Sequence, residues 1–376
     1  MNLLLVNDIN TTNTKLFIKE MSESLGPLDL EIDFSKNVVE TFFNYASMRK
    51  RKNALNNNNY SKLKSLLPNG DIKAIHNCLV YAIHFGKDSI AKKIIEMDYD
   101  KNNELDINEN HGEIFRYVVY YNRKFLIEPL IRIGADIHAD EDYALIKYCL
   151  LNDIQTVRLL IKNGADVYSR NCLSLVQAAG NGNLAIVKLL LEHQEKRVIS
   201  QISVKDFKPT NFDIALISAA TYNHLDIVTL LLKVGADGTI NNSEIFVNAA
   251  EKGNFAMVKI FLEHGLDPNI LEGVILKKVI KNGEYELAKL LIEFQLNGLY
   301  VCDLSIDDSA YLRWAAIKGD YDIAKLLLES VDSKGQPRCD VFAADNDAHR
   351  LATKYNHYRV IQLLEQHQKL RLDQKN

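Results

Sequence analysis

Apolar residues recur along most of the chain in two short helical patterns that alternate. In the stretch IQTVRLLIKNGADV, the residues Ile154, Val157, Leu160 and Ile161 fall on one face of a helix, at the spacing of a buried stripe. A second pattern lies upstream of each such stretch and carries a pair of alanines before a turn of Gly or Asn, as in SLVQAAGNGN from Ser174. The two patterns predict a pair of short antiparallel helices, an inner helix followed by an outer one.

The helix pair is repeated along the chain. One apolar position of the outer helix recurs every 30 residues, at Leu130, Leu160 and Leu190 and again at Leu231, Phe261 and Leu291. Weaker copies are centred on Ile94, Leu327 and Leu364. The longer intervals predict insertions between an outer helix and the next inner helix, at residues 99–110, 195–209, 296–308 and 333–340.

Small residues fit a stack of such pairs. Ala178 and Ala179 let neighbouring inner helices approach closely, and Gly164 and Gly235 stand where an outer helix must stop in the left-handed conformation. Helices this short are unstable alone, so each pair must bury its apolar face on the next. The sequence therefore predicts an all-α solenoid of nine or ten helix pairs over residues 61–367. We expect an N-terminal cap or degenerate helical segment over residues 1–60 and a polar tail over 368–376.

These repeats resemble ankyrin repeats. The resemblance rests on the Ala-Ala-x-x-Gly/Asn turn, the V-x-L-L outer helix and the terminal Gly-Ala-Asp, which occur together most fully from Ala178 to Asp237. The Thr-Pro-Leu-His start of the usual ankyrin inner helix is absent, and three residues are missing after Gly-Ala-Asp, so we expect shortened hairpins. This shortened form is similar to ankyrin proteins of giant viruses of amoebae. The resemblance implies a protein-binding scaffold that uses the concave face of its inner helices.

Composition limits the classes of partner. Charged residues make up 25% of the chain and the net charge is -4, so no long-range positive field attracts nucleic acid or an anionic membrane. The apolar run at the N-terminus is too short for a signal peptide, and the five cysteines are scattered. We expect a cytoplasmic monomer that binds one or more proteins, with no nucleic acid, membrane or cofactor. The basic run Arg49 to Lys52 is either a solvated helix end or a nuclear localisation signal.

The candidate binding residues follow one repeat position, the residue just before the alanine pair, where the chemistry varies while the period persists. Aromatic residues with a polar group are favoured at interfaces. The candidates at this position and on the next helical turn are Tyr81, Tyr117, Tyr121, Lys147, Gln177, Tyr222, Asn248, Lys252, Lys278, Trp314 and Lys318. Alternatively, several of them pack between adjacent inner helices, and recognition lies in the insertions.

Other chemistry has weaker support in the sequence. The acidic clusters at Asp140 to Asp142 and at Asp345, Asp347 and His349 could hold a metal, but acids just before a helix also serve as caps. We therefore expect a non-catalytic scaffold, with a viral or host-interaction role. The alternatives are a substrate-recruiting adaptor of a ubiquitin ligase and, less favoured, a metal-dependent enzyme.

Overall fold

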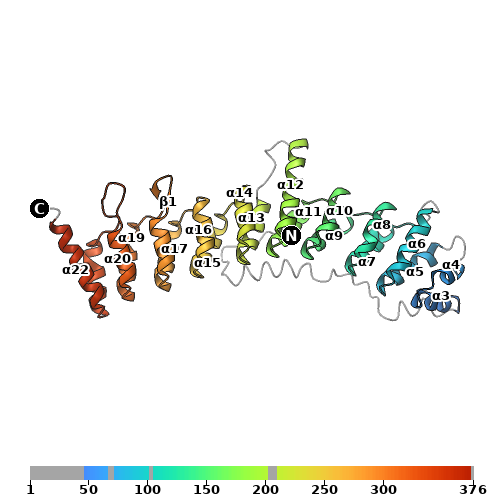
Figure 1. The fold of residues 1–376 in the computed structure, drawn as a ribbon, viewed down its shortest axis with the longest axis horizontal. Coiled ribbons are helices and arrows are strands. Elements are labelled where there is room, and N and C mark those ends of the chain that lie inside the picture. The colour runs from blue at the N-terminus through green and yellow to red at the C-terminus, as the bar shows by residue number, and fades with distance from the viewer. Residues whose placement is uncertain (1–45, 67–71, 101–104, 202–209, 374–376) are drawn as a thin grey trace. The chain divides into compact units, whose positions relative to one another are not determined.

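The computed structural model of the protein describes residues 46–66, 72–100, 105–201 and 210–373 (Figure 1). The chain divides into two compact units, Met1–Phe207 and Lys208–Asn376, which we call the N-terminal unit and the C-terminal unit. The division falls in the expected insertion at 195–209, most of whose side chains lie outside the described residues. The first 45 residues of the expected N-terminal segment and residues 101–104 of the 99–110 insertion also lie outside them.

The N-terminal unit is a stack of antiparallel helix pairs. An inner helix packs on the outer helix that follows it, and inner helices α3, α5, α7, α9 and α11 contact one another in that order. The elements are α3 (Ala46–Asn56), α4 (Tyr60–Leu66), α5 (Ile72–His84), α6 (Asp88–Asp100), α7 (Glu109–Tyr120), the 3₁₀ turn η1 (Lys124–Leu126), α8 (Ile127–Arg132), α9 (Ala139–Leu150), α10 (Ile154–Lys162), α11 (Ser169–Gly180) and α12 (Leu184–Gln201).

The C-terminal unit repeats this arrangement with inner helices α13, α15, α17, α19 and α21 in contact in chain order. Its elements are α13 (Thr210–Thr221), α14 (Leu225–Lys233), α15 (Ile240–Glu251), α16 (Phe255–Glu263), α17 (Ile270–Asn282), α18 (Tyr285–Glu293), β1 (Gln295–Leu296), β2 (Leu299–Tyr300), α19 (Ile306–Lys318), α20 (Tyr321–Glu329), α21 (Ala343–Lys354) and α22 (Tyr358–Asp373). The expected all-α repeat fold is confirmed. Helix α22 continues through the polar segment beyond residue 368 as far as Asp373.

The hairpins between successive repeats are reduced to tight turns, as expected. Among the described residues, paired strands occur only in the insertion after α18, where β1 and β2 form an antiparallel hairpin, and an isolated bridge joins Val331 to Pro337 after α20. The Gly-Ala-Asp signature makes the turn after α8, α10 and α14. Gly164 and Gly235 have φ angles of 101° and 94°, and the Asp166 carboxylate accepts a bond from the Tyr168 N–H at 3.1 Å.

The apolar position that recurs in every outer helix is buried in all nine copies, whereas Ile154 at the start of α10 is half-buried. Leu160, Leu190 and Leu231 are fully buried under the inner helices of their units, and Ala178 and Ala179 are fully buried where α11 meets its neighbours. The stripe of each outer helix therefore faces its own inner helix and the next repeat, as the spacing requires.

Polar side chains also join neighbouring repeats. The carbonyl groups in the last turn of an inner helix have no partner within the helix, and the turn of the next repeat supplies one. Asn183 Nδ2 donates to the Cys149 carbonyl at 2.9 Å, Arg123 Nε donates to the Ile83 carbonyl at 3.1 Å, and His357 Nε2 lies 3.0 Å from the Ile317 carbonyl. These bonds fix the register of one repeat on the next.

The basic run is not a uniformly solvated helix end. Arg51 is buried, and its Nε donates to the Leu66 carbonyl at 3.0 Å, which ties α3 to α4. Of the other lysines in the run, Lys50 is exposed and Lys52 is half-buried.

Replacing Leu160 or Leu231 by alanine should lower the free energy of unfolding by about 2 to 5 kcal/mol, because each change leaves a cavity in a packed core. Leu370 is 56% exposed on α22, so Leu370→Ala is the matched control and should cost less than about 0.5 kcal/mol. Denaturant unfolding followed by circular dichroism measures the difference. Equal losses in the core and control variants would contradict the burial described above.

All five cysteine thiols should react with a thiol reagent only after unfolding. Every cysteine is buried, and burial raises the pKa of the Cys302 thiol to about 12 and that of Cys339 to about 11, so little thiolate is present at pH 8. The measurement is the release of thionitrobenzoate with and without guanidinium. Fast release of even one equivalent by the native protein would show that a thiol is accessible.

Candidate protein-binding surface

The structure divides the sequence-predicted site residues by exposure. Tyr222, Lys252, Trp314 and Lys318 are exposed, whereas Tyr121, Lys147, Asn248 and Lys278 are half-buried. The expectation of a surface position is wrong for Tyr81, Tyr117 and Gln177, which are at most 8% exposed. Adjacent inner helices approach closely enough to enclose these three side chains. They therefore pack between inner helices, which was the alternative to a surface position.

The two buried tyrosines keep their hydroxyl groups hydrogen-bonded. Tyr81 Oη donates to Asn56 Oδ1 at 2.9 Å, and Tyr117 Oη donates to Glu113 Oε1 at 2.8 Å. Burial raises the pKa of both phenols, with the Glu113 carboxylate adding to the rise at Tyr117. Both phenols therefore stay protonated, and their buried rings support the side chains that pack against them.

These two tyrosines are the buried part of an aromatic cluster at the C-terminal ends of α5 and α7. We define the aromatic cluster as Tyr81, His84, Phe85, Tyr117, Tyr120 and Tyr121. Ring centroids are 4.3 Å apart for Tyr81 and Phe85 and 5.0 Å apart for Tyr120 and Tyr121. Phe85 is 49% exposed and Tyr120 is 38% exposed, so the cluster presents two rings to solvent on a rigid support.

A histidine links the two helices of the cluster. His84 Nδ1 lies 2.7 Å from Tyr121 Oη, and the two rings meet edge to face at 5.0 Å. Burial lowers the pKa of His84, and the nearby Arg123 guanidinium lowers it further. The imidazole is therefore neutral at physiological pH and shares a hydrogen bond with the phenol.

Lys147 closes the cluster on the α9 side. Its Nζ donates to the Tyr120 carbonyl at 3.0 Å and lies 5.5 Å from the centre of the Tyr120 ring and 6.0 Å from that of Tyr143. Burial lowers its pKa. This lysine fixes the end of α7 against α9 more than it offers a free charge to a partner.

The same repeat position has a different character in the C-terminal unit. Lys278 Nζ pairs with Glu251 Oε1 at 3.1 Å, which joins α17 to α15, and Trp314 is 37% exposed on α19. Lys252 and Lys318 lie one turn further along their helices and are exposed.

Two insertions of the C-terminal unit are joined by one arginine. Arg338 donates to the carbonyls of Ile292 and Cys302, both at 2.6 Å, and to Ser330 Oγ at 2.9 Å. Its guanidinium also lies 3.9 Å from the centre of the Tyr300 ring. The β1–β2 hairpin and the loop after α20 are thereby held together, with Leu299 at the hairpin 70% exposed.

The acidic clusters form ion pairs and hydrogen bonds within and between repeats. Arg170 pairs with Asp140 at 2.8 Å and with Glu141 at 3.0 Å, and Asp142 Oδ1 accepts a bond from the Asp166 N–H at 2.9 Å. Asp347 pairs with Arg313 and Arg350, while His349 faces Glu365. Within the described part of the chain, no group of three or more His, Cys, Asp or Glu side chains is placed to hold a metal ion.

Comparison with known proteins agrees with this geometry. A family profile of ankyrin repeats in three copies matches residues 115–206 and 246–337, and a single-repeat profile matches residues 212–243. Together they cover more than half of the chain. The chain belongs to the ankyrin repeat family.

Two ankyrin repeat proteins of Acanthamoeba polyphaga mimivirus are similar in sequence. One is 30% identical over 112 residues, which is 26% of this chain and 29% of that protein, and the other is 29% identical over 178 residues, which is 46% and 53%. The matches thus span about a third to a half of the length of these relatives. Their source confirms the resemblance to giant-virus ankyrin proteins. The crystal structure of the human ASB11 ankyrin repeat domain matches with a TM-score of 0.33 and 18% identity, over 54% of this chain and 95% of that one.

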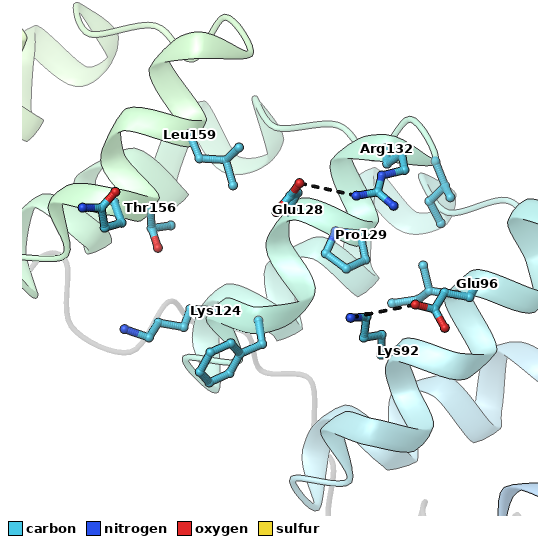
Figure 2. A pocket seen from close by; sticks show the side chains of 12 residues that line it. Lys92, Glu96, Lys124, Glu128, Pro129, Arg132, Thr156 and Leu159 are labelled. Carbon is cyan, nitrogen blue, oxygen red and sulfur yellow. Dashed lines mark hydrogen bonds and ion pairs between the residues drawn. The ribbon is translucent and has the colours of Figure 1, made fainter.

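The ankyrin stack also contains a groove on its outer helices. Figure 2 shows its lining between α6, α8 and α10, where Lys92 pairs with Glu96 and Arg132 with Glu128 beside Pro129. The groove measures about 810 Å³. Pro129 takes the helix position of Leu159 in the next repeat, and because proline has no N–H and obstructs the preceding turn, the start of this outer helix becomes the 3₁₀ turn η1.

The sequence contained a signal for some site residues that are not among the predicted binding residues. His84 and Phe85 fall three and four residues after Tyr81, on the same helical face, and Pro129 breaks the pattern of its outer helix. Arg338 had no such signal, since its four partners come from segments brought together only by stacking. In the described residues no helix is both long enough and apolar enough to span a membrane.

Replacing Arg338 by methionine should separate the two ankyrin insertions. The change keeps an unbranched apolar stem but removes the guanidinium group, which leaves the Ile292 and Cys302 carbonyls without their donor. We expect faster amide hydrogen exchange at residues 295–302 and 331–338 and little change in α13 to α16, measured by mass spectrometry. Unchanged exchange in both loops would show that the arginine does not hold them together.

Proposed function

We propose that this ankyrin repeat protein is a non-catalytic scaffold that binds a partner protein on its inner-helix face, with the aromatic cluster as the main anchor. The observation that carries the proposal is the exposure of Phe85 and Tyr120 on a support of buried, hydrogen-bonded tyrosines. Large rings held in place lose little conformational entropy on binding, so more of the burial energy contributes to affinity.

The electrostatics of the cluster favour an apolar or aromatic contact. His84 is neutral, and the Lys147 ammonium is taken up by the Tyr120 carbonyl and ring. The exposed rings therefore meet a partner through area and shape more than through charge. The mimivirus relatives support a role in which the partner is a viral or host protein of an infected cell, and this role remains part of the proposal.

A capture experiment tests the proposal. The tagged full chain and its Phe85→Ala/Tyr120→Ala variant are used to capture proteins from an amoebal lysate for mass spectrometry. The matched control is Phe125→Ala/Tyr358→Ala, which also removes one phenylalanine and one tyrosine, here 74% and 71% exposed away from the inner helices. We expect one or more partners to be lost with the first variant and kept with the control.

Thermal melting of all three proteins shows whether each is folded before capture. A partner kept by the folded Phe85→Ala/Tyr120→Ala variant would contradict the proposal. A partner lost only with the control variant would instead favour the outer helices as the binding face.

A further inference from the structure

Four exposed lysines mark the ends of successive inner helices in the C-terminal unit. Lys252 follows α15, Lys281 and Lys318 lie in the last turns of α17 and α19, and Lys354 ends α21. We call these four residues the lysine row. Because α15, α17, α19 and α21 contact one another in that order, the row places one ammonium group on each repeat.

Within the part of the chain that the structure describes, the lysine row has no acidic partner. None of its four members forms an ion pair with another described residue, although Lys354 lies 5.6 Å from the centre of its neighbour's ring, Tyr355. Other cations on the same helices are paired: Lys278 with Glu251, and Arg313 with Asp307 and Asp347. The cations left without an acid are thus gathered at one end of the inner helices.

A cation is not a requirement of an inner-helix end in this fold. Lysines near a helix C-terminus are stabilised by the helix dipole. Yet α7 and α11 have no basic residue in their last turn, whereas α5 and α9 carry His84 and Lys147 there. Helix stability therefore does not account for a lysine on four repeats in succession.

The spacing of the row matches a particular kind of ligand. Helices packed side by side lie about 8 to 10 Å apart. A polyproline II segment has three residues per turn and rises about 3.1 Å per residue, so every third side chain lies on one face, about 9 Å from the next. A carboxylate at every third residue would then stand opposite each lysine in turn.

We infer that the lysine row binds an extended acidic protein segment with Asp or Glu at every third residue, and that Trp314, 37% exposed on α19, packs on its apolar residues. This inference rests on the proposed function as a scaffold and assigns a partner class to its C-terminal unit. A nucleic acid fits less well. Along each duplex strand its phosphates rise only about 3.4 Å per nucleotide, which does not match one charge on each repeat.

Fluorescence anisotropy with synthetic peptides tests the inference on the full chain. One labelled peptide contains four Glu-Pro-Ala repeats, and the other has the same composition with its glutamates consecutive. We expect the first to bind about fivefold more tightly at low salt and to weaken as salt rises, since exposed ion pairs are screened.

Two variants that lose the same charge separate the row from the overall electrostatics. Lys281→Gln/Lys318→Gln should weaken binding of the repeating peptide by about fivefold or more. Lys259→Gln/Lys325→Gln, on outer helices α16 and α20, is the control and should bind as the unchanged protein does. Circular dichroism melting checks that both variants are folded.

Equal affinity for the two peptides, an equal loss in the two variants, or no binding of either peptide would overturn the inference. So would tighter binding of an oligothymidylate that depends on the same lysines, because it would make the row a nucleic-acid site. These outcomes are independent of the capture experiment, which depends on Phe85 and Tyr120 in the N-terminal unit. Either proposal can fail while the other stands.

Discussion

The structure depends on the fact that no helix pair can bury its own apolar surface. Outer helices such as α10, α14 and α16 have only nine residues, and the stripe of α10, formed by Val157, Leu160 and Ile161, is wider than one inner helix can cover. The stripe must also contact the next repeat. This requirement fixes the small residues between inner helices, because Ala178 and Ala179 allow the close approach on which the burial of Leu160 and Leu190 depends.

Polar bonds between repeats follow from the same close approach. When an inner helix ends against its neighbour, its last carbonyls are withdrawn from water and must find donors there. Asn183, Arg123 and His357 are chemically different, yet each comes from the turn of one repeat and reaches the inner helix of the preceding one. The turn thus specifies register while the apolar stripe supplies most of the free energy, which is why the turn sequence varies more than the stripe.

The fold could be read from the sequence because both of its determinants are local. Three local features predict the helix pair and its stacking without reference to distant residues. They are the period of Leu160 and Leu231, the alanine pairs, and the glycines that follow outer helices. The candidate site was less accessible. Whether Tyr81 or Tyr117 is exposed depends on the distance between two inner helices, and a one-repeat pattern cannot give that distance. The position of Arg338 depends on two insertions that meet only after stacking.

Repetition leaves few positions free to vary, and this limits where recognition can arise. In each repeat one side of the inner helix is buried in the core. Carbonyl groups in the last turn of that helix accept hydrogen bonds from the next repeat. What remains is the short surface from the residue before the alanine pair to the end of the helix. At that surface the N-terminal unit carries Phe85 and Tyr120, whereas the C-terminal unit carries exposed lysines such as Lys281 and Lys318 together with Tyr222 and Trp314. Since both sets stand on equivalent scaffolds, their difference costs the fold almost nothing. Under the proposed function, one chain can therefore offer an apolar anchor and a charged one without any change to its core.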